Sequence, residues 1–119
     1  MYDHIGLKVS DLDASIRFYA AALAPLGHVL CSRDESGAGF GPLDAPALWL
    51  YRGKNGDRAG VHLAFRATDH AAIKAFHAGG LKAGGHDNGA PGRRADYSPT
   101  YYAAFLIDPD GNNVEAVFT

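Results

Sequence analysis

Residues 4–11 read HIGLKVSD, and residues 62–69 read HLAFRATD. Position by position, the two stretches match histidine with histidine, apolar with apolar residues, a basic with a basic residue and a hydroxyl with a hydroxyl. Each stretch alternates between apolar and other residues, which is the period of a strand. Each also ends in a hydroxyl residue and an aspartate, which are residues that cap helices. The pattern therefore predicts a duplicated unit that begins with a strand and continues into a helix.

Each half of the chain also predicts three further strands. The first helix carries apolar residues at helical spacing from Leu12 to Leu23 and ends before Pro25, and the second is expected to stop at Gly79–Gly80. Extended segments are expected at residues 27–33, 37–41 and 46–52 after the first helix, and at 84–88, 101–107 and 112–118 after the second. A tight turn at residues 108–111, DPDG, joins the last pair, because proline fixes φ and glycine supplies a positive φ.

The order βαβββ–βαβββ indicates an α+β fold. We expect one domain over residues 1–119, built from one module at residues 1–53 and a second at residues 59–119. A short polar linker at residues 53–58 separates the two modules.

Composition restricts the class of function. The net charge is −2 and the longest run of basic residues is Arg93–Arg94, so no nucleic acid partner is expected. No apolar stretch approaches the roughly 20 residues needed to cross a bilayer, so no membrane partner is expected either. The single cysteine, Cys31, excludes an internal disulfide, and the first residues lack the basic and apolar segments of an export signal. We therefore expect a cytoplasmic protein.

Three residues have the side chains and the strand parity of a metal site. His4, His62 and Glu115 each lie on the strand face opposite an apolar row, so they are expected to converge on one cavity. Two imidazoles and a carboxylate leave coordination positions open for water or substrate. Either histidine alone also fits a structural role, but the repeat favours ligands because both occupy the same position of the duplicated unit. We predict a site for one divalent metal ion: Fe, Mn, Ni or Zn.

Residues 9–19, VSDLDASIRFY, and residues 108–115, DPDGNNVE, together with the two histidines, resemble the vicinal-oxygen-chelate superfamily. This superfamily includes glyoxalases, bleomycin-resistance proteins and extradiol dioxygenases. The resemblance covers essentially the whole chain and implies a curved mixed sheet around a cavity, in a homodimer. It also implies that a metal chelates two adjacent oxygens of a small-molecule substrate and stabilises an enolate or a similar oxyanion. Whether His4 meets His62 and Glu115 within one chain or across the dimer is left open.

Two positions depart from well-known members of the superfamily. Trp49 stands where four-ligand members such as glyoxalase I carry a further Glu or Gln, and an indole cannot coordinate a metal. Phe105 stands where extradiol dioxygenases and fosfomycin-modifying transferases carry a Tyr, and a benzene ring cannot transfer a proton. Isomerase, lyase or transferase-like chemistry is expected, with plain glyoxalase I, dioxygenase and fosfomycin-type activity disfavoured. The general base is unassigned, and His86 is a candidate for a base or a further ligand.

Seven other residues are candidates for contact with the substrate. The segment 86–102 reads as a long loop rich in arginine and tyrosine, and such loops in compact domains are often functional. Its candidates for holding an anionic substrate are Arg93, Arg94, Tyr97 and Tyr101. Lys8 stands near the place of an arginine that binds glutathione in glyoxalase I, and Trp49 and Tyr51 offer an aromatic wall for a planar or apolar group. Each of these side chains also fits a solvated or packed surface residue.

Two functions without turnover stay open beside the enzyme. A small-molecule binding or sequestering protein of the bleomycin-resistance type would use the same cavity, and a structural dimer would carry a decayed site. The metal content of protein purified without added metal separates the enzyme from the binding protein.

Overall fold

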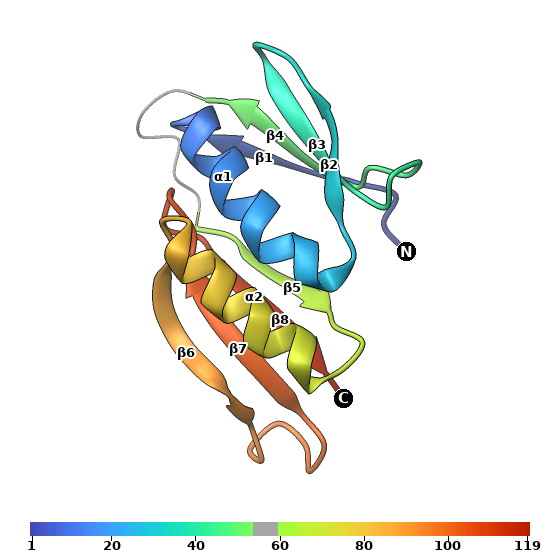
Figure 1. Cartoon of the computed structure of the whole chain (residues 1–119), viewed down its shortest axis with the longest axis vertical. Helices are drawn as coiled ribbons and strands as arrows, with labels where there is room; N and C mark the ends of the chain where they lie inside the picture. Colours follow the sequence, from blue (N-terminus) through green and yellow to red (C-terminus); the bar gives the residue numbers. More distant parts are fainter. Residues whose placement is uncertain (54–59) are drawn as a thin grey trace.

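The structure, a computed structural model, describes residues 1–53 and 60–119. These residues fold as two βαβββ modules (Figure 1). The first module contains β1 (Ile5–Val9), α1 (Leu12–Leu23), the short 3-10 helix η1 (Ala24–Leu26), β2 (Val29–Arg33), β3 (Gly37–Gly41) and β4 (Leu48–Arg52). The second contains β5 (His62–Arg66), α2 (His70–Lys82), β6 (His86–Arg93), β7 (Tyr102–Ile107) and β8 (Asn113–Phe118). The predicted element order is confirmed. Residues 54–58 of the predicted linker and Ala59, the predicted start of the second module, lie outside the described residues.

Each module forms its own four-stranded mixed sheet. The strand order is β1-β4-β3-β2 in the first sheet and β5-β8-β7-β6 in the second, so the two modules share one topology. In each sheet the first strand pairs in parallel with the last, and the remaining neighbours are antiparallel. Strands β1 and β5 are consequently edge strands of their sheets.

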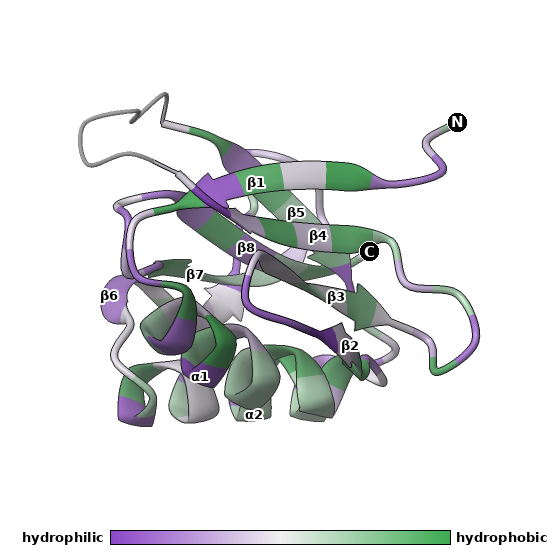
Figure 2. Cartoon of the chain, turned by 90° about the horizontal axis from the view of Figure 1, so that it is seen from above, coloured by the Kyte–Doolittle hydropathy of each residue, from purple (hydrophilic) through white to green (hydrophobic). Residues whose placement is uncertain are grey.

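Both helices lie on the same side of the strands (Figure 2). Side chains of one parity, such as Leu7, Leu50 and Val114, point toward the helices and are buried with Phe18 and Phe76 in one core. Burying each such side chain contributes about 1.5–3 kcal/mol to folding. Side chains of the other parity point away from the helices, to what we call the open face. His62 and Glu115 have this parity, as do the predicted substrate contacts Lys8, Trp49 and Tyr51.

Aspartates begin both helices, as the repeat predicts. The side chain of Asp11 accepts a hydrogen bond from the backbone N–H of Ala14 at 3.0 Å, and Asp69 accepts one from Ala72 at 2.8 Å. Each bond satisfies a donor that the first helical turn leaves without an intrahelical partner.

Helix α2 continues through the glycines that were expected to end it, and stops at Lys82. The reason is packing: a Cβ on Gly80 would lie 2.3 Å from a methyl carbon of Leu106, and a Cβ on Gly79 would lie 2.9 Å from the backbone oxygen of Ala21. These glycines therefore allow α2 to lie close to α1 and to β7. No described helix is long and apolar enough to cross a membrane.

The turn between β7 and β8 fastens the second module to the start of α1. The backbone N–H and the hydroxyl of Ser10 donate to Asp110 Oδ1 at 3.0 and 2.6 Å, and the buried hydroxyl of Tyr19 donates to Asp108 Oδ2 at 2.6 Å. Asp108 also accepts bonds from the backbone and side-chain N–H groups of Asn112. Gly111 has φ 88°, as the turn requires. Much of the DPDGN stretch thus joins the modules.

The extended segment predicted at residues 84–88 overlaps the start of strand β6, whereas the loop predicted at residues 86–102 is wrong over residues 86–93, which form that strand. The pairing with β7 is irregular between Asp87 and Gly89 and again between Gly89 and Gly92. Bulges of this kind accommodate glycine and proline in a strand and remove the regular alternation that a sequence pattern relies on.

Candidate functional site

His62 and Glu115 lie side by side on the open face of the second sheet. Nε2 of His62 is 3.0 Å from Oε2 of Glu115, and Nδ1 is 3.2 Å from the backbone oxygen of Asn113. The side chain of Glu115 is 4% exposed, whereas that of His62 is 50% exposed. The pair therefore combines a buried carboxylate with an accessible imidazole.

The contacts of His62 fit a metal ligand. Both of its ring nitrogens face oxygen acceptors, but a neutral imidazole carries only one N–H and leaves a lone pair against the other oxygen. Three arrangements remove this repulsion: a doubly protonated ring, a carboxylic acid form of Glu115 that donates to Nε2, and a neutral ring whose Nδ1–H donates to Asn113 while Nε2 and Glu115 share a cation. The last is the arrangement that metal-bound histidines usually adopt, so the donor set of His62 and Glu115 fits a divalent metal.

Tyr101 holds the other oxygen of the carboxylate. Its hydroxyl donates to Glu115 Oε1 at 2.5 Å. This hydrogen bond, together with burial and the negative charge of Glu115, raises the pKa of Tyr101 to about 12, so the phenol stays protonated at neutral pH. The family resemblance places a phenol at position 105, where this chain has phenylalanine, and Tyr101 supplies the phenol instead. Strand parity is consistent with this, because residues 101, 103 and 105 share one face.

Phe105 packs beside the pair. Its ring stacks with that of His62, with centroids 6.4 Å apart and planes at 20°. On the other side, the guanidinium carbon of Arg94 lies 5.4 Å from the Phe105 centroid, a cation–π distance. Phe105 cannot transfer a proton, but its ring packs against both His62 and Arg94.

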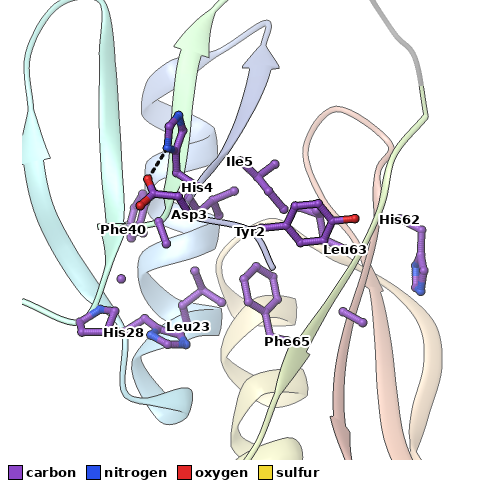
Figure 3. A pocket seen from close by; sticks show the side chains of 15 residues that line it. Tyr2, Asp3, His4, Ile5, Leu23, His28, Phe40, His62, Leu63 and Phe65 are labelled. Atoms are coloured by element: carbon purple, nitrogen blue, oxygen red, sulfur yellow. Dashed lines mark hydrogen bonds and ion pairs between the residues drawn. The ribbon is translucent and has the colours of Figure 1, made fainter. Parts of the chain in front are cut away.

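His4 does not join this group within the chain. It precedes β1, is largely exposed, and its Nδ1 lies 2.7 Å from Asp3 Oδ1. His4 and His62 lie on opposite sides of the pocket and do not point toward each other (Figure 3). In residues 1–53 and 60–119, no three His, Cys, Asp or Glu side chains are placed to hold one metal ion. The structure thus brings together two of the three predicted ligands.

A cavity of about 400 Å³ lies between the modules (Figure 3). Its wall is mostly apolar and comes from the start of β1, the end of α1, and β5. His28 also contributes to it, and burial lowers the pKa of His28 from its ordinary value. Nδ1 of His28 is buried without a hydrogen-bond partner among the described residues. His4 and His62 both line this cavity, whereas Glu115 does not.

Three predicted substrate contacts lie together on the open face of the first sheet. Across β1 and β4, Gly6 pairs with Trp49 and Lys8 pairs with Tyr51. In the second module, Ala64, the counterpart of Gly6 in the repeat, pairs with Glu115. Trp49 therefore occupies in the first module the position that Glu115 occupies in the second, as the sequence predicts.

The four candidates after α2 divide into two groups. Tyr101 donates to Glu115, and Arg94 packs on Phe105, which in turn stacks with His62. Arg93 instead donates to the backbone oxygen of Pro99 at 3.2 Å, and the exposed ring of Tyr97 meets that of Tyr101 edge to face. These two brace the loop that follows β6. His86 pairs with Ile107 at the outer strand of the sheet, so β7 and β8 separate it from His62.

Known proteins similar to this chain are glyoxalase-like. Residues 4–117 match the family model of a glyoxalase-like domain. A glyoxalase/bleomycin resistance protein from Albidiferax ferrireducens T118 is 32% identical with a TM-score of 0.84, and the match covers 98% of each chain. No curated protein sequence matches.

Two more distant structures share the fold. A glyoxalase-related enzyme from Fulvimarina pelagi is 18% identical with a TM-score of 0.76, over 100% of this chain and 88% of the other. Lactoylglutathione lyase from Agrobacterium tumefaciens is 20% identical with a TM-score of 0.66, over 98% of this chain and 92% of the other.

Proposed function

The chain belongs to the glyoxalase-like domain family of the vicinal-oxygen-chelate superfamily, and we propose that it is a metal-dependent enzyme acting on a small substrate with two adjacent oxygens. The observation that carries this proposal is the His62–Glu115 pair, in which an imidazole nitrogen and a carboxylate oxygen face each other at 3.0 Å on an open sheet face. The reaction is of the isomerase, lyase or transferase kind. We assign the enzyme to the cytoplasm on the basis of its single cysteine.

The protein groups around the pair orient and shield it. A bound divalent metal supplies Lewis acidity toward the substrate oxygens. The backbone oxygen of Asn113 orients the His62 ring, and the hydroxyl of Tyr101 orients the Glu115 carboxylate. Phe105 shields one side of His62 from water, and Arg94 offers a positive charge for an anionic group of the substrate.

We further propose that the third ligand is His4 of the partner subunit in a homodimer. Two features support this. His4 is exposed and lies at the start of an edge strand, and His62 is half exposed on an edge strand of the other sheet. A twofold axis can place the edge that carries His4 of one chain against the edge that carries His62 of the other. The same contact then occurs twice and makes two equivalent sites.

Metal analysis tests the proposal. Protein purified without added metal should contain close to one Fe, Mn, Ni or Zn ion per chain, and His62→Ala and Glu115→Ala should abolish it. His77→Gln is the matched control, because it removes an imidazole that bonds Asp87 from α2, on the helix side of the sheet. If the purified protein holds no metal and both site substitutions leave its thermal unfolding temperature unchanged, the proposal is contradicted and a non-catalytic binding protein is favoured.

Mixed dimers locate the third ligand. Chains carrying His4→Ala and chains carrying Glu115→Ala each lack metal as homodimers if both residues are ligands. In a site shared between subunits, the mixed dimer has one site with both substitutions and one intact site, so it regains about one metal ion per dimer. If His4 acts within its own chain, the mixed dimer stays metal-free. If His4 binds no metal, the His4→Ala homodimer already holds its full complement of metal, and the proposed ligand is wrong.

A further inference from the structure

The open face of the first sheet carries two aromatic rings that lie on glycines. On β3, Ala38 and Phe40 point into the core, so Gly37 and Gly39 face the open side. A Cβ on Gly39 would lie 2.7–2.9 Å from three atoms of the Trp49 six-membered ring. A larger residue at position 39 would therefore displace the indole from this place.

The ring of Tyr51 also lies against glycines. A Cβ on Gly6 of β1 would lie 3.0 Å from its Cε2, and a Cβ on Gly37 of β3 would lie 3.4 Å from its Cδ1. The ring thus has a glycine on each neighbouring strand. In the second module, the residue in the place of Gly39 is Phe105, which pairs with Glu115 as Gly39 pairs with Trp49. In the first module, Trp49 therefore stands in the place of the acid and Gly39 in the place of the aromatic ring, which leaves space for the indole.

The three glycines let both rings lie close to the sheet, and the rings stay accessible from the open face. Tyr51 is 44% exposed and Trp49 is half-buried. Among residues 1–53 and 60–119, neither the indole N–H nor the Tyr51 hydroxyl makes a hydrogen bond to the protein. Lys8 pairs with Tyr51 across β1 and β4 and adds a positive charge beside it.

From this arrangement we propose that Trp49, Tyr51 and Lys8 form a binding platform for a planar aromatic or heteroaromatic ligand that carries an anionic group. The aromatic rings stack with the planar part of the ligand, and the ammonium of Lys8 with the two unbonded hydrogen-bond donors attracts its negative group. The proposal deepens the proposed function by naming a substrate class, and it rests on that function only in treating the ligand as the substrate.

Trp49 is the only tryptophan in the chain, so its fluorescence reports directly on the platform. The 119-residue protein, stripped of metal with a chelator, is titrated with 4-nitrobenzoate, alone and in the presence of excess cyclohexanecarboxylate as a non-planar competitor, and with methyl 4-nitrobenzoate as the uncharged planar probe. We expect saturable quenching by 4-nitrobenzoate and no displacement of it by cyclohexanecarboxylate. The ester should bind about tenfold more weakly, which corresponds to one ionic contact. Because the titration is made without metal, its outcome does not depend on the outcome of the metal analysis.

Variants assign the binding to the platform. Tyr51→Leu should weaken 4-nitrobenzoate binding about tenfold, and Lys8→Gln should reduce it to the level of the ester. Arg17→Gln, which removes an exposed positive charge from α1 on the helix side of the sheet, should leave binding unchanged. Gly39→Val should displace the indole and abolish quenching; if this variant does not fold, the other two still decide. Absence of saturable quenching, displacement of 4-nitrobenzoate by an equal concentration of cyclohexanecarboxylate, or binding that survives both Tyr51→Leu and Lys8→Gln overturns the proposal.

Discussion

The hydroxyl of Tyr101 donates a 2.5 Å hydrogen bond to the buried carboxylate of Glu115, whose other oxygen faces His62. Tyr101 comes immediately before β7, and Glu115 lies on the neighbouring strand β8. The bond uses one carboxylate oxygen and leaves the second toward the open face. Orientation of a carboxylate by such an outer hydrogen bond is typical of metal sites.

Tyr101→Phe should weaken metal binding by about 10–100-fold, because the Glu115 carboxylate loses the donor that orients it. In metal-free protein the same change should lower the free energy of unfolding by about 1–3 kcal/mol, since a buried oxygen is left without a partner. Competition with a chromophoric chelator and urea unfolding measure the two effects. Tyr102→Phe is the control, because the ring of Tyr102 stacks on His70 at the other face. Equal metal affinity in Tyr101→Phe and wild type contradicts the positioning role.

Asp110→Ala should lower the free energy of unfolding by about 1–3 kcal/mol, because it removes two hydrogen bonds from Ser10 and a negative charge near the N-terminus of α1. Asp96→Ala, at an exposed position of the loop after β6, should change it by less than about 0.5 kcal/mol. Urea denaturation measures both. Similar midpoints for the two variants would show that the turn does not hold the modules together.

Gly80→Ala should destabilise the protein by about 1–3 kcal/mol through overpacking, although alanine favours helix by about 1 kcal/mol over glycine. The added methyl would lie 2.3 Å from Leu106, so Leu106→Val should relieve much of the cost when both changes are combined. A double-mutant cycle measured by thermal unfolding gives the coupling. Additive effects of the two substitutions would exclude this contact as the cause.

Acidification should destabilise the fold in part through His28. Burial lowers its pKa in the folded state, so the unfolded chain takes up this proton first as the pH falls below the ordinary value of 6.5. The stability that the neutral ring contributes is therefore complete above that value and is lost progressively toward the lowered folded pKa. Urea unfolding from about pH 8 to about pH 5 should show a shallower decline for His28→Phe than for wild type. Identical slopes would count against this role.

The repeated stretch at residues 4–11 and 62–69 predicts a strand and a capped helix at the start of each module, because strand alternation and helix capping are local properties. Local pattern found only the start of β6, where bulges break the alternation, and missed the end of α2, where Gly79–Gly80 allow close packing. In the candidate site, parity placed His62 and Glu115 on one face, and the register brought them into contact.

Sequence alone thus determined the element order, the family and which side chains reach the open face, since each follows from the spacing of residues along a strand or helix. Tertiary structure decided which of these side chains meet. It joined Tyr101 to Glu115, left His4 apart from both, and laid Trp49 over Gly39, because pairing register and the packing of separate strands set these distances. Spacing along the chain assigns a residue to a face, but only the assembled sheets assign it a neighbour.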